Sequence, residues 1–376
     1  MKRFLLAVAA MATMVLNASA QDWNMIVTHT DGTVETIPTT EVSKVSFKLN
    51  VADVNADQVI VKELYVGGCP KDEGTSAFQQ DKGFVLYNNC GQKAVINNLC
   101  VAFANPYNGH GSNDWYDENG VLYYEDKDFL PANDGVWYLT SPLIIEPYSQ
   151  VVVSCMGSVD NTQTYSQSVN YANPDYYCMY DPESGYTLAS YYPTPSELIP
   201  TSHYFKAVRV GQSTAWALSM SSPAFYIFRA IDTDFAAYGT DADNIIYAPN
   251  SKQSNSDRCI SIPREWIIDG VEVYAQASVS NSQKRLTADV DAGYVPFVNK
   301  LGYTVYRNVD KEMTEALPEN EGKLVYGYSM GVDDSTDPSG IDAEASIKNG
   351  AHIIYMDTNN SSNDFHMRKK FSIRGE

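Results

Sequence analysis

The sequence predicts an all-β protein, because short strand-like runs recur along most of its 376 residues. These runs are rich in β-branched and aromatic residues and are bounded by Gly, Asn, Asp and Pro, as strands joined by turns are. Helical periodicity is nearly absent, and only a helix of a turn or two is expected at residues 311–317, before Pro318. Many short strands with polar loops are typical of a β-sandwich or a β-barrel.

Residues 1–20 have the pattern of a secretory signal peptide. Two basic residues precede a short apolar run, and a small-residue motif ending at Ala20 predicts cleavage before Gln21. The apolar run is too short for a membrane span, which needs ~20 residues, and no later window is apolar enough. Because no cysteine follows the cleavage site, a lipoprotein anchor is not expected. We expect an exported protein of a Gram-negative bacterium, located in the periplasm, on the outer cell surface or in the medium.

Residues 21–50 are expected to form a small separate β unit. Two alternating runs within 25–38 flank Asp31-Gly32, a strong β-hairpin signal, and 42–47 would add a third short strand. The remaining boundaries are a linker at 51–58, a main β-domain at 59–376 and an insertion in that domain at 157–210.

The main domain contains seven clear strand signals. They are short, apolar or alternating, and separated by turn residues. They lie at residues 59–66, 83–88, 95–104, 150–156, 224–230, 266–274 and 303–307.

The charge of the chain argues against nucleic acid as a partner. The sequence has 46 acidic and 26 basic residues, a formal net charge of −20. Such a chain repels phosphate backbones, and no cluster of Lys or Arg reverses this locally.

The six cysteines are compatible with disulfides in an exported protein, although the sequence cannot resolve their pairing. Two of them lie in apolar strand-like runs, where a free thiol serves equally well as a small hydrophobic residue. The spacing does not match a zinc site. The disulfide candidates are Cys69, Cys90, Cys100, Cys155, Cys178 and Cys259.

The order of the strands, from VIVKELYV through KGFVLYNN and INNLCVAF to WIIDGVEVY, resembles a lamin-tail-like domain, an immunoglobulin-like β-sandwich. Three later features are Asp291-Ala292-Gly293-Tyr294, a strand ending at Arg307, and DTNNSSNDF at 357–365. With these, residues 57–370 resemble the DUF4876 type of uncharacterised exported Bacteroidetes proteins. The resemblance implies an elaborated β-sandwich that acts as an interaction module.

The stretch DTNNSSNDF raises the question of a Ca²⁺ site, because Asp, Asn and Ser oxygens alternate along it. In an EF-hand-like reading, position 6 should be Gly and is Ser362, and position 12 should be Glu and is Arg368. We therefore expect a rigid turn in which the polar side chains bond their own backbone, and no metal. The residues of this turn lock are Asp357, Asn359, Asn360, Asp364 and Phe365.

Two aromatic segments are candidates for ligand binding. The acidic loop at 107–128 could stack sugar faces on its rings, or these rings could pack into the core. The insertion has nine tyrosines between residues 165 and 204, which is typical of a recognition loop or of a self-packed cover. The candidate residues are Trp115, Tyr116, Tyr123, Tyr124, Tyr176, Tyr177, Tyr191 and Tyr192.

Catalytic signals are weak. The nearest approach to a nucleophile elbow, at residues 211–215, lacks its second glycine, and the five histidines are scattered. The leading hypothesis is a non-catalytic envelope protein that binds a glycan or a protein surface, without a cofactor. The alternatives are an accessory protein for haem, iron or nutrient uptake, with His203-Tyr204 as candidate haem ligands, and a hydrolase with an unrecognised acidic site.

Overall fold

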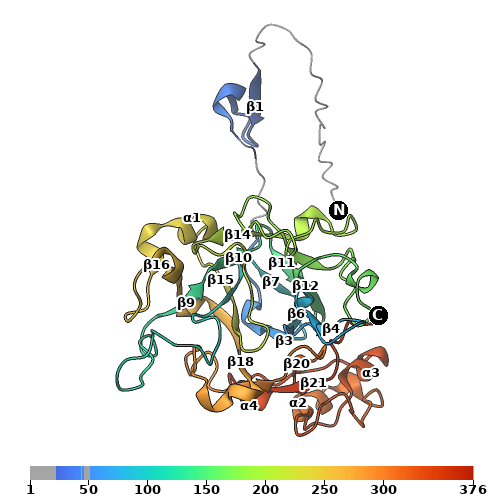
Figure 1. Cartoon of the computed structure of the whole chain (residues 1–376). Helices are drawn as coiled ribbons and strands as arrows, with labels where there is room; N and C mark the ends of the chain where they lie inside the picture. Colours follow the sequence, from blue (N-terminus) through green and yellow to red (C-terminus); the bar gives the residue numbers. More distant parts are fainter. Residues whose placement is uncertain (1–22, 44, 46–50, 376) are drawn as a thin grey trace. The chain divides into compact units, whose positions relative to one another are not determined.

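The computed structural model describes residues 23–43, 45 and 51–375, and the chain divides into two compact units, Met1–Lys48 and Leu49–Glu376. The described part of the first unit is an antiparallel hairpin of β1 (Asn24–Thr28) and β2 (Val34–Pro38) (Figure 1). Its turn has Gly32 at φ +85°, a conformation that glycine adopts without strain. The predicted signal peptide lies outside the described residues, as does half of the expected strand at 42–47.

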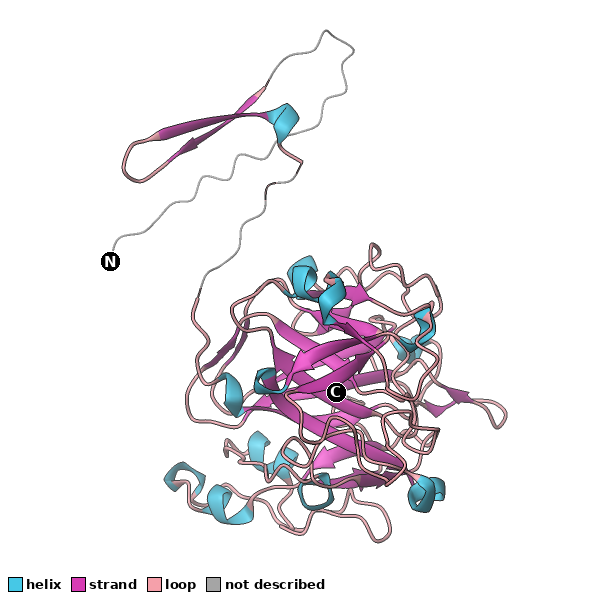
Figure 2. Ribbon diagram, turned by 90° about the vertical axis from the view of Figure 1, so that its left-hand side faces the viewer, coloured by secondary structure: helices cyan, strands magenta, loops and turns pink. Residues whose placement is uncertain are grey.

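The second unit is built around one mixed sheet of twelve strands, and the structure as a whole is mainly β, with 32% strand and 15% helix. The sheet is surrounded by loops and short helices (Figure 2). In spatial order its strands are β19 (Val295–Phe297), β18 (Ile267–Ala275), β15 (Ala224–Arg229), β8 (Leu99–Phe103), β10 (Gly135–Tyr138), β14 (Tyr204–Arg209), β13 (Tyr177–Met179), β12 (Gln150–Met156), β6 (Lys82–Asn88), β3 (Val59–Tyr65), β20 (Thr304–Arg307) and β21 (Phe365–Arg368).

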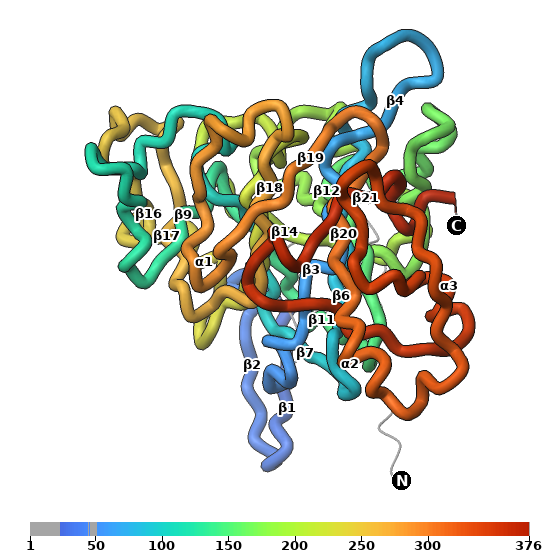
Figure 3. Tube along the Cα trace, turned by 90° about the horizontal axis from the view of Figure 1, so that it is seen from below, coloured from blue at the N-terminus to red at the C-terminus, as the bar shows by residue number. Residues whose placement is uncertain are grey.

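The sheet curves until its first and last strands come together, so that it forms a nearly closed barrel. Strands β19 and β21 lie side by side (Figure 3), and the backbone N–H of Val298 donates to the Met367 sulfur at 3.3 Å. The mainly β prediction is confirmed, whereas a sandwich of two packed sheets is not shown. Sequence periodicity does not separate the two architectures, because both alternate side chains between an inner and an outer face.

The main hydrophobic core lies on one face of this sheet. It contains a buried side chain from every one of the twelve strands, for example Val61, Phe84, Trp137 and Phe365. The opposite face carries three further apolar clusters, which bring in loops, short helices and the chain end. Strands such as β3 and β6 are therefore buried on both faces along their whole length.

The main-domain strands expected from sequence are present, with one division, whereas the described residues 42, 43 and 45 of the strand expected at 42–47 do not form a strand. The run at 95–104 is split into β7 (Ala94–Ile96) and β8, because Asn98 between them adopts φ +49° and turns the chain. Small sheets accompany the barrel and contain β11 (Leu143–Ile145) paired with β7, β16 (Ile245–Ile246), β17 (Cys259–Pro263) and β9 (Phe129–Asn133), and β4 (Cys69–Pro70) with β5 (Ala77–Phe78).

The α-helices are short, and each begins at an Asp or Asn side chain that accepts a hydrogen bond from the first turn. The expected helix near residue 311 is present. The helices are α1 (Phe235–Thr240), α2 (Lys311–Glu315), α3 (Ala343–Lys348) and α4 (Ser361–Asp364). In the described part of the chain, no helix is long and apolar enough to cross a bilayer.

Candidate functional site

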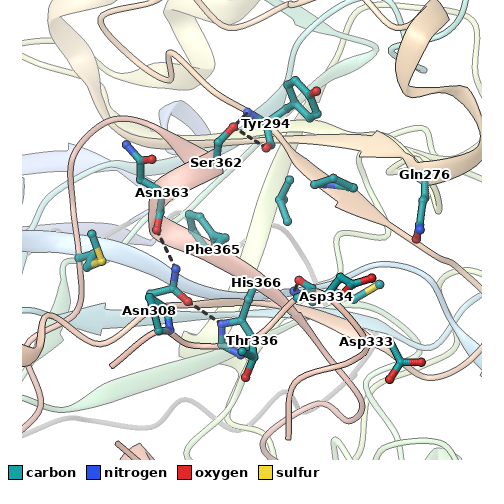
Figure 4. A pocket seen from close by; sticks show the side chains of 16 residues that line it. Gln276, Tyr294, Asn308, Asp333, Asp334, Thr336, Ser362, Asn363, Phe365 and His366 are labelled. Carbon is teal, nitrogen blue, oxygen red and sulfur yellow. Dashed lines mark hydrogen bonds between the residues drawn. The ribbon is translucent and has the colours of Figure 1, made fainter. Parts of the chain in front are cut away.

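A pocket of about 820 Å³ lies where the two ends of the sheet meet. We call it the seam pocket. Its walls come from β19, from α4 and β21, and from a turn at residues 333–338 (Figure 4). The polar or aromatic side chains that line it are Gln276, Tyr294, Asn308, Asp333, Asp334, Ser335, Thr336, Ser362, Asn363, Phe365 and His366.

One wall is the DTNNSSNDF stretch, which forms a turn held by its own side chains. The carboxylate of Asp364 accepts hydrogen bonds from the N–H and hydroxyl of Thr358 and from the N–H of Asn360. The amide oxygen of Asn360 accepts from the N–H of Ser362 and begins α4, and Asn359 adopts φ +51°. The carboxylate oxygens of Asp364 and the amide oxygen of Asn360, which could have bound a metal, are therefore used inside the turn.

The turn is fastened to the Asp291-Ala292-Gly293-Tyr294 segment. Asp291 accepts from the N–H and hydroxyl of Ser361 at 2.7 and 2.6 Å, and the Ser362 hydroxyl bonds the backbone of Tyr294. Gly293 is required at this contact, because a Cβ there would lie 2.0 Å from the Asn360 oxygen. Two motifs about 70 residues apart thus form one wall of the seam pocket.

Arg307, the last residue of β20, supplies the positive charge beneath this turn. Its guanidinium lies 2.5 Å from Asp269, 3.0 Å from Asp357 and 3.8 Å from Asp364, and over the ring of Phe365 at 4.5 Å. Burial opposes the charge, but the three carboxylates together raise the pKa of Arg307. A buried cation therefore offsets part of the negative charge of the turn from inside the protein. Among the described residues there is no group of three or more His, Cys, Asp or Glu arranged to hold a metal ion.

His366 lies at the floor of the seam pocket with both ring nitrogens engaged. Asn308 donates its amide N–H to the carbonyl of Asn363 at 2.7 Å, so its amide oxygen accepts from Nδ1 of His366, also at 2.7 Å (Figure 4). Nε2 then accepts from the Tyr328 hydroxyl at 2.6 Å. Burial and the nearby Arg368 lower the pKa of His366 to about 3, so the imidazole is neutral at physiological pH.

The opposite wall is a tight turn in which Val332 and Ser335 bond each other's backbone. This turn holds Asp333 and Asp334 exposed at the pocket edge, and Asp334 adopts φ +60°. The Ser335 hydroxyl accepts from the backbone N–H of Met367, which ties the turn to β21. None of the described residues that line the pocket is Lys or Arg, so its edge offers mainly hydrogen-bond acceptors.

The predicted aromatic platform at 107–128 is divided between core and surface. Trp115 and Tyr124 are buried in one of the three apolar clusters on the face of the sheet opposite the main core, so almost none of either ring is exposed to a ligand. Tyr116 is half-buried and Tyr123 is 44% exposed. Together with acidic and amide residues they line a second pocket of about 320 Å³, which we call the loop pocket; its other residues are Trp115, Asp117, Glu118, Asn119, Pro249 and Asn250.

The tyrosine-rich insertion is part of the barrel. It supplies β13, which pairs in parallel with β12 and β14 and contains Tyr177. Tyr177 stacks on His203, with ring centroids 4.0 Å apart, and His203 Nδ1 lies 3.1 Å from the carbonyl oxygen of Tyr176. Tyr191 and Tyr192 pack against the main core. The four predicted ligand-binding residues of the insertion line neither the seam pocket nor the loop pocket; they are Tyr176, Tyr177, Tyr191 and Tyr192.

The cysteines are all free thiols in this structure. Five are buried and Cys90 is partly exposed. Burial raises the pKa of the Cys155 thiol to about 12, so it behaves as a small apolar side chain.

Sequence reasoning identified part of the seam pocket and missed the rest. The motifs at 291–294 and 357–365 were noticed, but Tyr294 was not assigned to a ligand site. Asp333, Asp334 and Asn308 were not singled out, and His366 was noted only as one of five scattered histidines. The polar, turn-rich run GVDDSTDPSG at 331–340 was the available signal for the missing wall.

The fold and the seam pocket define a mainly β protein with a ligand-sized cavity of mixed polar and apolar lining at the closure of its sheet. Residues 146–329 match a family profile described as "Protein of unknown function (DUF4876)", which supports the resemblance to that family. The structure is similar to the crystal structure of a DUF4876 family protein from Bacteroides thetaiotaomicron VPI-5482. The TM-score is 0.57 at 18% sequence identity, over 91% of this chain and 80% of that one. At this identity the likeness shows a shared fold. No curated protein matches the chain.

Proposed function

We propose that this protein is an exported, non-catalytic binding protein of the bacterial envelope, and that the seam pocket binds an uncharged glycan. Export rests on the signal-peptide pattern of residues 1–20. The resemblance to lamin-tail-like interaction modules belongs to the same proposal, since it also implies binding without catalysis.

The observation that carries the proposal is the composition of the seam pocket. Its volume of about 820 Å³ lies within the range of small-molecule sites, roughly 300–1,000 Å³. Asp333, Asp334 and Asn363 offer acceptors and an amide for hydroxyl groups, while the partly exposed Tyr294 offers apolar surface for the C–H face of a sugar ring. With no Lys or Arg among the described lining residues, the pocket does not favour a phosphate, sulfate or carboxylate.

The same geometry provides little for catalysis. Both nitrogens of His366 are engaged, and the hydroxyls of Ser335 and Ser362 already bond the backbone. A general base and a nucleophile within hydrogen-bond reach of each other are what acyl transfer needs. The described seam pocket instead holds groups that are preorganised for recognition.

The test is a thermal-shift screen of the mature protein against mannose, xylose and glucose oligomers, with haem and Ca²⁺ as alternative ligands. An oligosaccharide at about 100 times its Kd should stabilise the protein by about 2.7 kcal/mol. Stabilisation by haem or Ca²⁺ alone, or by none of these compounds, would overturn the proposal.

The site is tested with the double substitution Asp333→Asn and Asp334→Asn. Asparagine tolerates the left-handed conformation of Asp334, so the turn should persist while the charged acceptors are lost. We expect about tenfold weaker oligosaccharide binding by calorimetry, because hydrogen bonds to charged groups contribute about 1.5–3 kcal/mol. Asp175→Asn, at an exposed position outside the seam pocket, is the matched control and should leave affinity unchanged.

A further inference from the structure

The seam pocket and the loop pocket have the same chemical character. Each combines at least one tyrosine ring with carboxylate and amide groups, and neither has Lys or Arg among its described lining residues. In the loop pocket, the Tyr123 ring contacts the Trp115 ring, with centroids 6.2 Å apart, and the Lys127 ammonium lies 4.5 Å from the Tyr123 ring centroid. The ring is fixed in place and still 44% exposed, which suits a stacking surface.

A layer formed by Tyr116, Lys284 and Tyr294 connects the two pockets. Tyr116, which lines the loop pocket, donates its hydroxyl to the backbone carbonyl of Lys284 at 3.1 Å. Lys284 in turn donates its ammonium to the carbonyl of Gly293, and the next residue is Tyr294 of the seam pocket. The Tyr294 ring stacks on the Tyr274 ring with centroids 4.2 Å apart, and this contact fixes the position of Tyr294.

The charge of Lys284 on this connecting layer is neutralised. Its ammonium lies 3.5 Å from Glu272 and 3.9 Å from Asp291, and both carboxylates are buried. The side chain of Lys284 itself is only 26% exposed. The layer between the pockets therefore presents no unpaired cation that would select an anionic ligand.

We infer that the seam pocket and the loop pocket are two subsites for one extended, uncharged oligosaccharide, which crosses the layer formed by Tyr116, Lys284 and Tyr294. This inference rests on the proposed function and specifies its ligand as a chain of several sugar units. A ligand that occupies two linked subsites gains affinity by effective concentration, because the second contact is intramolecular.

The experiment compares two and six units of β-1,4-mannose, β-1,4-xylose and β-1,3-glucose by isothermal calorimetry. The hexasaccharide of the series that binds should have an affinity about 100-fold above that of its disaccharide. Tyr123→Ala should remove most of this gain and leave disaccharide binding unchanged. Tyr326→Ala, another exposed tyrosine outside both pockets, is the matched control and should alter neither affinity.

The outcomes separate the inference from the proposed function. If both lengths bind equally and only the substitutions at Asp333 and Asp334 weaken binding, the seam pocket stands alone and the two-subsite inference is overturned. If Tyr123→Ala weakens the disaccharide as much as the hexasaccharide, the loop pocket is the primary site, which also overturns it. If no oligosaccharide of any length binds, the proposed function is lost together with the inference.

Discussion

The tyrosine-rich insertion and the DTNNSSNDF turn are both conspicuous in the sequence, but the fold uses them in opposite ways. The insertion contributes β13 to the sheet and packs Tyr191 and Tyr192 against the main core. The turn folds on its own polar groups and becomes a wall of the seam pocket. Residue type alone is therefore a poor guide to exposure, because large aromatic side chains gain free energy by burial wherever a core is within reach.

The polar turn depends on a cation that lies far from it in sequence. Asp357 and Asp364 belong to the turn, but their counter-charge is Arg307 on β20, which also pairs with the buried Asp269. The insertion also has a buried carboxylate, Asp181, but its cation Lys206 lies 2.9 Å away within the same insertion, and Tyr191 and Tyr192 are held by packing on the core. The two regions should therefore respond differently to single substitutions.

The largest effect is expected for Arg307→Leu. The substitution leaves Asp269 and Asp364 buried without their cation, which typically costs about 3–5 kcal/mol. Urea unfolding followed by circular dichroism measures the loss. Arg307→Lys keeps the positive charge but not the planar guanidinium, so it should lose less stability than Arg307→Leu.

The control is Arg258→Leu, at an exposed arginine, which should change stability by less than about 0.5 kcal/mol. A loss below about 1 kcal/mol for Arg307→Leu would mean that the turn is held by its own bonds alone.

A smaller loss is expected in the insertion from Tyr192→Ala. Tyr192 packs on the core and its hydroxyl accepts from the N–H of Trp216 at 2.9 Å. Removing the ring should cost about 2–3 kcal/mol in the free energy of unfolding. Leu198→Ala, in the same insertion but 58% exposed, should be nearly neutral. Equal effects of the two substitutions would show that the insertion is a loose cover.

The smallest effect concerns the pH dependence that His366 creates at the seam pocket. Its pKa is lowered from 6.5 to about 3, so below pH 6.5 the unfolded chain binds a proton that the folded protein does not. Stability should therefore fall as pH drops through the window from 6.5 to about 3, by about 1 kcal/mol between pH 6 and pH 5.

The His366→Gln variant lacks this titrating group, so its free energy of unfolding should fall less between pH 6 and pH 5 than that of the wild type. Urea unfolding at both pH values measures the difference. His352→Gln, at a half-exposed histidine, is the comparison and should leave the wild-type pH dependence in place. If His366→Gln and the wild type lose the same stability between pH 6 and pH 5, the histidine is charged in the folded state.

Much of the fold could be predicted because strand propensity and turn chemistry are local. The runs at 59–66, 83–88 and 150–156 correspond to β3, β6 and β12 within a residue or two. Short strands such as β13, β19 and β21 were missed, since three or four residues carry little periodicity. Of the candidate site, the 357–365 turn was recognised because its capping residues act within a few positions along the chain.

Strand propensity, composition and turn chemistry predict a mainly β, strongly acidic protein with a polar turn at 357–365. The near closure of the sheet, the position of Arg307 beneath the turn, and the placement of Asp333 and Asp334 across a pocket from it follow from the packing of distant segments. The two groups of features differ in the sequence separation of the residues whose interactions produce them. Turns and strands follow from neighbours along the chain, whereas the pairing of distant strands and charges depends on which surfaces the fold brings together.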